Sequence, residues 1–180
     1  MKRFACPVIV LSLLVCGAAR AQFVVDKVDA RRVDEQVRVQ AHLDLSLTDA
    51  AEQALAHGVS LIVIHEVALK KNGWLWNREQ QRSSEWHRLR YHALSGRYVV
   101  DSEDAVLDTF RTVTEALEFI NSTSATFEVP ERGPAYTVAV RSRIDINALP
   151  APLRPTALFS PQWQLSSDWS QWPIDASTTN

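Results

Sequence analysis

The stretch Val37-Arg-Val-Gln-Ala-His-Leu-Asp-Leu-Ser-Leu47 alternates apolar and polar residues without interruption. A period of two places successive side chains on opposite faces of a β-strand, so this stretch predicts a strand with one buried and one wet face. Antiparallel sheets commonly show this pattern, whereas parallel sheets are covered on both faces. The stretch therefore favours an antiparallel β fold.

Outward from this strand, both neighbouring segments fit the same fold. Residues 23–30 read as a preceding strand, joined to it through the polar residues 31–35 as a hairpin. On the other side, Thr48 is a helix N-cap for residues 49–57, and Gly58 stops that helix. Residues 59–69 are apolar on both alternating faces, which predicts a central strand covered on both sides.

The second half of the chain also contains strand and helix signals. Strands are expected at residues 84–93 and 97–101, around a tight turn that contains Gly96. A capping box from Thr112 to Glu115 opens a second helix that ends near residue 121. After a loop at 130–134, residues 136–146 alternate again. A proline-rich irregular segment then leads to a short strand at about 163–165.

These elements predict a mainly β protein, an antiparallel β-sandwich or open barrel with two short helices. Since no repeat or long linker divides the chain, residues 22–175 are expected to form a single domain. Residues 176–180 are expected to be a disordered tail.

The N-terminus has the organisation of a signal peptide over residues 1–21. Lys2 and Arg3 are followed by an uncharged apolar stretch, and small residues at 19 and 21 predict cleavage between Ala21 and Gln22. At about 16 residues, the apolar stretch is shorter than the roughly 20 that span a bilayer. The alternatives are a retained membrane anchor and lipid attachment at Cys16, for which the preceding Val15 is a poor fit.

Cleavage at this position changes the chemistry that is open to the chain. Both cysteines, Cys6 and Cys16, leave with the signal, so the mature chain has no disulfide, thiol nucleophile or cysteine metal site. Three cationic residues leave as well, which makes the mature chain more acidic than the net charge of −2 for the whole chain. An acidic net charge disfavours a nucleic-acid partner. Once the signal peptide is removed, the mature chain is expected to carry no transmembrane segment.

No motif for catalysis, cofactor binding or metal binding emerges from the sequence, so no catalytic residue, cofactor or metal is predicted. His65-Glu66 begins like a zinc-protease helix, but Leu69 stands where the second histidine would be, and the segment reads as a strand. His87 and His92 are five residues apart on a predicted strand and therefore lie on opposite faces. An alternative reading is a hydrolase that uses His87 or His92 with a nearby carboxylate.

The most unusual surface feature is a basic, tryptophan-rich region. Between residues 70 and 97 the chain has seven lysines and arginines against two glutamates, together with three tryptophans. On the predicted strand 84–93, alternation places Trp86, Arg88, Arg90 and His92 on one face, and Arg97 follows the turn. These five residues are the predicted partner-binding surface, because Trp and Arg dominate binding hot spots. The alternative is an exposed face whose arginines pair with acidic residues and lie over the tryptophan rings.

Three further tryptophans, Trp163, Trp169 and Trp172, are predicted to pack in the core rather than to stack against a bound sugar.

Three motifs resemble a family of exported proteobacterial proteins, the domain of unknown function 4390 family. The motifs are Arg88-Leu-Arg-Tyr-His-Ala-Leu-Ser-Gly-Arg-Tyr98, Asn147-Ala-Leu-Pro150 and Trp163-Gln-Leu-Ser-Ser-Asp-Trp169-Ser-Gln-Trp172. The resemblance covers about residues 37–172. It implies a Gram-negative periplasm and brings an association with two-component sensor kinases, but it implies no activity, cofactor or catalytic residue.

Together these observations favour a non-enzymatic periplasmic binding or interaction module, and the resemblance suggests a link to envelope sensing with a two-component sensor kinase. Its partner would be a protein or an anionic component of the envelope. Two other classes stay open: the envelope hydrolase described above and a purely structural envelope protein.

Overall fold

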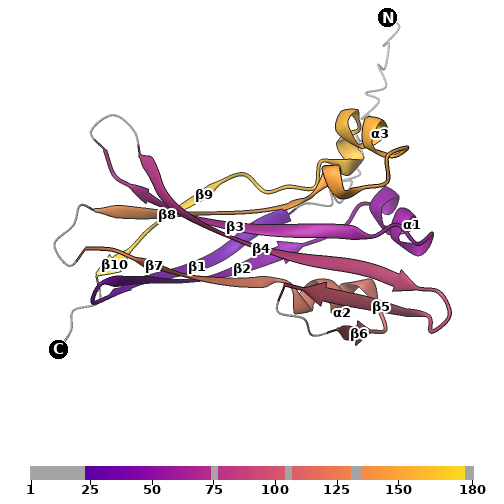
Figure 1. Ribbon diagram of the computed structural model, residues 1–180, viewed down its shortest axis with the longest axis horizontal. Helices are drawn as coiled ribbons and strands as arrows, with labels where there is room; N and C mark the ends of the chain where they lie inside the picture. Colours follow the sequence, from indigo (N-terminus) through magenta and orange to yellow (C-terminus); the bar gives the residue numbers. More distant parts are fainter. Residues whose placement is uncertain (1–22, 74–76, 104–106, 131–134, 177–180) are drawn as a thin grey trace, which may run out of the picture.

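The computed structural model describes residues 23–73, 77–103, 107–130 and 135–176. The predicted signal peptide, its cleavage site and the last four residues of the predicted tail lie outside these ranges. Most described residues belong to two β-sheets that pack face to face as a sandwich (Figure 1). The fold class predicted from the alternating pattern is thereby confirmed.

The smaller sheet, sheet A, has four strands in the order β10-β1-β2-β7. Its strands are β1 (Phe23–Val33), β2 (Gln36–Leu45), β7 (Ser122–Glu128) and β10 (Asp175–Ala176). All pairings are antiparallel except the short parallel contact of β1 with β10. The turn between β1 and β2 is shorter than the predicted 31–35, because Arg31 and Arg32 still pair with β2. Asp34, within the turn, has a positive φ of 54°.

The larger sheet, sheet B, has six strands in the order β6-β5-β4-β3-β8-β9. Its strands are β3 (Leu61–Lys71), β4 (Arg78–His92), β5 (Arg97–Ser102), β6 (Asp108–Phe110), β8 (Tyr136–Ile144) and β9 (Ser170–Pro173). The apolar strand predicted at 59–69 is β3, and it is central, because it lies between β4 and β8. Only its odd residues face the other sheet; Ile62 and Ile64 on its outer face are half-buried, so the predicted coverage of both faces was wrong.

Short helices close one end of the sandwich (Figure 1). They are α1 (Asp49–Ala56), α2 (Val113–Phe119), α3 (Arg154–Phe159) and the 3-10 turns η1 (Ile146–Ala148) and η2 (Pro161–Trp163). The two predicted N-caps are confirmed: Thr48 accepts from the Ala51 amide, and Thr112 accepts from the Glu115 amide. Gly58 ends α1 with a φ of 87°, which a residue without Cβ adopts most easily.

Several sequence-based boundaries were wrong. The proline-rich segment contains a third α-helix, α3. Pro155 lies in its first turn, where the amide hydrogen that proline lacks would have no partner within the helix. The final strand of sheet B is Ser170–Pro173, and residues 161–163 form η2 instead. β6 and β7 were not predicted, because the one is only 3 residues long and the other alternates small Ser, Thr and Ala residues with little hydrophobic contrast.

The core lies between the two sheets. Its largest fully buried apolar side chains come from both layers and from the helices: Phe23, Leu55, Leu61, Leu69, Leu89, Ile120 and Leu149. Trp163 is buried in this core as predicted, and Trp172 packs against it. Trp169 is different, because it lies against charged side chains outside the core. Among the described residues, no helix is long and apolar enough to cross a membrane.

Candidate functional site

The outer face of sheet B carries most of the charged side chains of interest. On β3, the odd residues 61–69 point into the core, so Glu66 and Lys70 point outward. The strand registers place outward side chains of β4, β5 and β8 beside them. We call this surface the arginine face; it comprises Glu66, Lys70, Glu79, Arg82, Trp86, Arg88, Arg90, His92, Arg97, Asp101, Arg141, Arg143, Asp145 and Trp169.

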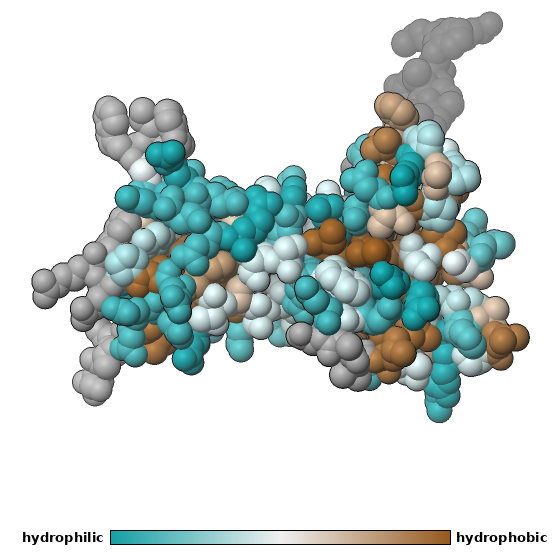
Figure 2. Space-filling model, in the orientation of Figure 1, coloured by the Kyte–Doolittle hydropathy of each residue, from teal (hydrophilic) through white to brown (hydrophobic). Residues whose placement is uncertain are grey.

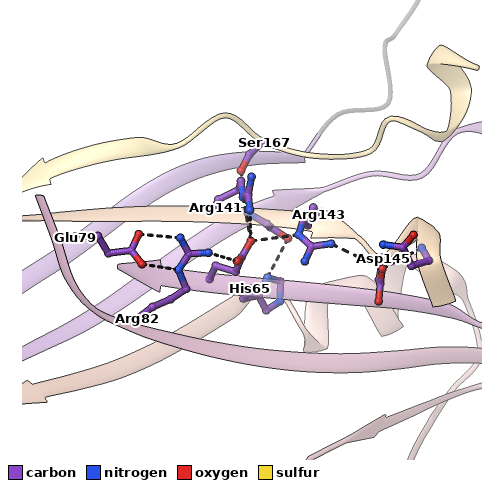
Figure 3. Close-up of polar contacts among 10 residues, drawn as sticks. His65, Glu79, Arg82, Arg141, Arg143, Asp145 and Ser167 are labelled. Atoms are coloured by element: carbon purple, nitrogen blue, oxygen red, sulfur yellow. Dashed lines mark hydrogen bonds and ion pairs between the residues drawn. The ribbon is translucent and has the colours of Figure 1, made fainter. Parts of the chain in front are cut away.

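Glu66 is the shared partner of three residues of the arginine face, Arg82, Arg141 and Arg143, which are labelled in Figure 3. Its side chain is only 6% exposed, yet its two oxygens accept hydrogen bonds from three arginines. Arg82 donates from Nη1 to Oε1 at 2.8 Å, Arg141 donates from Nη2 to Oε2 at 2.5 Å, and Arg143 donates from Nε to Oε2 at 3.2 Å. A buried carboxylate is stable only with such partners, and here it has more cations than it can neutralise.

The pKa of Glu66 reflects two opposing effects. Burial acts to raise it, but the hydrogen bonds and positive charges of Arg141 and Arg143 outweigh burial, so the pKa lies below its usual range. Glu66 is therefore ionised at neutral pH.

Trp169 covers this cluster. The guanidinium carbon of Arg141 lies 4.6 Å from the centre of the indole, that of Arg82 lies 5.2 Å away, and Nζ of Lys70 lies 5.4 Å away. Cations prefer the negatively polarised face of an aromatic ring, so Trp169 holds long side chains that would otherwise move freely.

The predicted binding residues lie next to this cluster. His87 and Leu89 are buried while Trp86, Arg88 and Arg90 point outward, as the alternation predicted. The guanidinium of Arg88 lies 5.4 Å from the Trp86 ring, and Asp101 forms ion pairs with Arg88 at 3.3 Å and Arg90 at 3.4 Å.

His92 and Arg97 lie opposite one another where β4 turns into β5, at the end of the same face. The Nδ1 atom of His92 hydrogen-bonds the hydroxyl of Ser95 at 2.9 Å. The structure thus places all five predicted binding residues on one surface, and their role in binding stays a prediction.

Positive charge is in excess on the arginine face. Its cations are Lys70, Arg82, Arg88, Arg90, Arg97, Arg141 and Arg143. Its carboxylates are Glu66, Glu79, Asp101 and Asp145, and every one of these forms an ion pair with at least one of the arginines. Seven cations therefore face four carboxylates that are already engaged. Figure 2 shows hydrophilic residues over much of the side that is turned to the viewer, with larger hydrophobic patches toward the helical end.

A second polar group lies between the sheets. His65 is 1% exposed; its Nε2–H donates to the Ile120 carbonyl at 2.8 Å, and its Nδ1 accepts from the Ser142 hydroxyl at 3.0 Å. Both ring nitrogens are thus satisfied with the ring neutral. Burial, together with the nearby His87, lowers the pKa of His65 to about 4.

His87 lies beside His65, with the ring centres 5.2 Å apart. Its Nδ1 lies 2.7 Å from the hydroxyl of Ser102, and its Nε2 lies 3.4 Å from Oε1 of Glu85, too far for a good hydrogen bond. Glu85 in turn accepts from the hydroxyl of Thr123 at 2.8 Å. Burial lowers the pKa of His87, although the charge of Glu85 acts in the opposite direction.

His87, Glu85, Ser102 and Thr123 line a cavity of about 720 Å³ beside β7. Of the two histidines in the hydrolase alternative, His87 lies in this cavity with a carboxylate and a hydroxyl, whereas His92 is exposed at a turn. Within the described ranges, no three His, Cys, Asp or Glu side chains are grouped so as to hold a metal ion.

Sequence reasoning missed the centre of the arginine face. Glu66 appeared only as part of a failed zinc motif, and Trp169 was assigned to the core. The available signal was the alternation over 136–146, which puts Arg141 and Arg143 on one face. What the sequence could not supply is the register that sets Arg141 opposite Glu66.

The fold and this site define a class: a two-sheet β-sandwich domain with a cationic outer face. The chain belongs to a family whose model, described as Domain of unknown function (DUF4390), matches residues 20–173. This confirms the family suggested by the three sequence motifs. Neither the curated proteins nor the solved structures contain a match.

Proposed function

We propose that this protein is an exported, non-enzymatic binding module of the periplasm, which holds an anionic partner against the arginine face. The observation that carries the proposal is the excess of positive charge on that face. Three arginines share the single buried carboxylate of Glu66, and Arg88 and Arg90 share Asp101. A carboxylate-bearing or phosphate-bearing partner would complete the charge balance.

The side chains are also ordered in a way that suits binding. Arg88 and Arg90 are 41% and 45% exposed, so their guanidinium groups can be reached from solvent. Each is nevertheless oriented by Asp101, and Arg88 also by Trp86. Ordering before binding lowers the entropy that association costs, and Arg and Trp are the residue types that dominate interface hot spots.

The periplasmic location rests on the predicted signal peptide and on the family's exported members. A partner at the membrane fits this location, and the association of the family with two-component sensor kinases makes the extracytoplasmic part of such a sensor a reasonable candidate. In that case the module acts in envelope sensing.

The test is charge reversal on the arginine face, using poly-L-glutamate as a defined anionic probe. We expect Arg88→Glu with Arg90→Glu to weaken binding at least tenfold. The matched control is Arg31→Glu with Arg38→Glu on sheet A, which changes the net charge equally and, like the first pair, breaks an ion pair to an aspartate. If both double variants bind as wild type does, or lose binding equally, the arginine face is not the site.

A second candidate function, an envelope hydrolase, is favoured by one observation, the chain of Ser102, His87 and Glu85 in the cavity. Here Ser102 would be the nucleophile and His87 Nδ1 its base. Glu85 would orient the ring once its Oε1, which lies 3.4 Å from Nε2, comes within hydrogen-bond distance. An alkyl fluorophosphonate probe distinguishes it from the binding module: labelling of wild type but not of Ser102→Ala supports the hydrolase, and no labelling removes it. A purely structural role would be indicated if neither binding nor labelling is found.

A further inference from the structure

One edge of sheet A is open for pairing. In the β2–β7 ladder, Leu43 N–H donates to Asn121 O, and Val129 N–H donates to Glu35 O. The intervening odd residues of β7 therefore bond to β2, and the even residues Ser122, Ser124 and Thr126 turn their N–H and C=O groups away from it. Within the part of the chain that the structure describes, no hydrogen bond reaches these six groups.

The other sheet edges are protected by length, a bulge or composition. β10 pairs only with Arg31 and Arg32, so the rest of β1 is also an edge, but it has a bulge between Val25 and Lys27 and a lysine at position 27. β10 has 2 residues, β6 has 3, and β9 has 4 and ends at Pro173, which has no N–H to offer. β7 has 7 residues, with the sequence Ser-Thr-Ser-Ala-Thr-Phe-Glu, and contains no proline, lysine or bulge. Proteins normally block so long an edge because it invites pairing with another chain.

Two hollows lie along β7. The cavity of about 720 Å³ is bordered by Ser122, Thr123 and Ser124 at the start of the strand. It reaches inward to Glu85 and His87 and also includes outward residues of β1 and β2 such as Asp29, so the edge is accessible from both sides there. A smaller hollow of about 400 Å³ lies at the far end, beside Glu128, Val129 and Pro130.

Among the described residues that line the two hollows, carboxylates outnumber lysines and arginines, unlike on the arginine face. The first hollow is lined by Asp29 and Glu85 against Lys27, and the described lining of the second includes Glu35 and Glu128. Two cations lie nearby, because Arg38 pairs with Thr126 between the hollows and Arg32 donates to the Pro130 carbonyl. Inside the first hollow, His87 is 6% exposed and its Nε2 has no hydrogen-bond partner. An incoming side chain that donates a hydrogen bond to Glu85 would gain a charged acceptor in a partly buried place.

We propose that β7 receives an extended, basic segment of a protein partner as an additional strand of sheet A. Main-chain hydrogen bonds to Ser122, Ser124 and Thr126 would give affinity, and alternating lysine or arginine side chains would reach the carboxylates on either side of the edge. This site is separate from the arginine face and of opposite charge preference, so it goes beyond the function proposed above.

The sharpest test uses proline, because the Ser124 N–H is not needed by the β2–β7 ladder. Ser124→Pro removes that donor at an edge position where proline is tolerated, and Ser124→Ala keeps it. The probe is a synthetic nine-residue peptide that alternates Lys with Val and Thr, and its counterpart carries Glu in place of Lys. A third peptide is N-methylated on every second residue, which blocks pairing without any change to the protein.

We expect the lysine peptide to bind wild type and Ser124→Ala equally and to slow amide hydrogen exchange at Ser122, Ser124 and Thr126. We expect at least tenfold weaker binding by Ser124→Pro, by the glutamate peptide and by the N-methylated peptide. The proposal is overturned if the lysine peptide fails to bind wild type, or if N-methylation leaves its affinity unchanged. It is also overturned if sedimentation shows a dimer of this chain that Ser124→Pro dissociates, because the occupant of β7 would then be a second copy.

Discussion

Arg141 binds Glu66 and is stacked against Trp169 at the same time. Its Nη2 donates to Oε2 of Glu66 at 2.5 Å, and its guanidinium carbon lies 4.6 Å from the centre of the indole ring. Arg82 and Arg143 bind the same carboxylate. Glu66 on β3 therefore fixes the arrangement of three arginines from the two strands that flank β3, β4 and β8. The order of this half of the arginine face thus depends on one buried acid, whereas Arg88 and Arg90 are oriented by Asp101.

The first prediction concerns removal of that charge. Glu66→Gln leaves three guanidinium groups without their shared carboxylate, so we expect the free energy of unfolding to fall by about 2 kcal/mol in urea denaturation. The control is Glu79→Gln, which removes an exposed partner of Arg82 and should cost about 0.5 kcal/mol or less. Equal effects from the two variants would show that Glu66 does not organise the cluster.

The cluster around Glu66 is also the part of the site that could not be predicted from the sequence. Period-two alternation was enough for the strand at 37–47 and for the outward row on β4, and the apolar run at 59–69 was enough for the central strand β3, because each depends only on residues close in sequence. The Glu66 cluster depends on pairing β3 with β8, 75 residues apart for Glu66 and Arg141. The edge of β7 was missed for a related reason: small Ser, Thr and Ala residues alternate too weakly to indicate a strand.

The second prediction concerns pH. The pKa of His65 is lowered to about 4 in the folded protein, so below pH 6.5 the unfolded chain binds a proton that the folded chain does not. Stability should therefore be full above pH 6.5 and fall as the pH drops toward 4. His65 contributes about 3 kcal/mol of that loss at most. His87, whose pKa is also lowered, acts in the same direction.

Urea denaturation between pH 7 and pH 4.5 measures this loss. His65→Gln can keep a donor and an acceptor but cannot titrate, so its stability should depend clearly less on pH than that of wild type. Gln40→Ala, at an exposed position on β2, changes no titratable group and should leave the wild-type dependence unchanged. A steep loss that persists in His65→Gln would assign the effect to other groups.

The third prediction concerns the end of α1. Gly58 has a φ of 87°, and a Cβ added there would meet nothing within 4 Å. Gly58→Ala should therefore destabilise the protein only through backbone strain, by about 1 kcal/mol. Gly58→Asn should cost less, since asparagine visits the left-handed region more readily. Thermal unfolding compares the two, and equal losses would point to a cause other than this strain.

The fourth prediction concerns export. Intact-mass measurement of protein from the periplasmic fraction should give a chain that begins at Gln22, with neither cysteine present. Ala21→Leu, which replaces the small residue before the cleavage site, should leave precursor at the membrane. Recovery of the chain from the cytosol with Met1 still attached would contradict both the location and the proposed class of partner.

The most direct measurement of the central claim is photo-crosslinking in living cells. A photoreactive amino acid at Trp86, on the arginine face, should give a covalent adduct with an envelope component, and the adduct should disappear when Arg88→Glu and Arg90→Glu are added. The same amino acid at Arg38, on the outer face of sheet A, should not give that adduct. An identical adduct from both positions, or an adduct from Trp86 that survives charge reversal, would contradict the account.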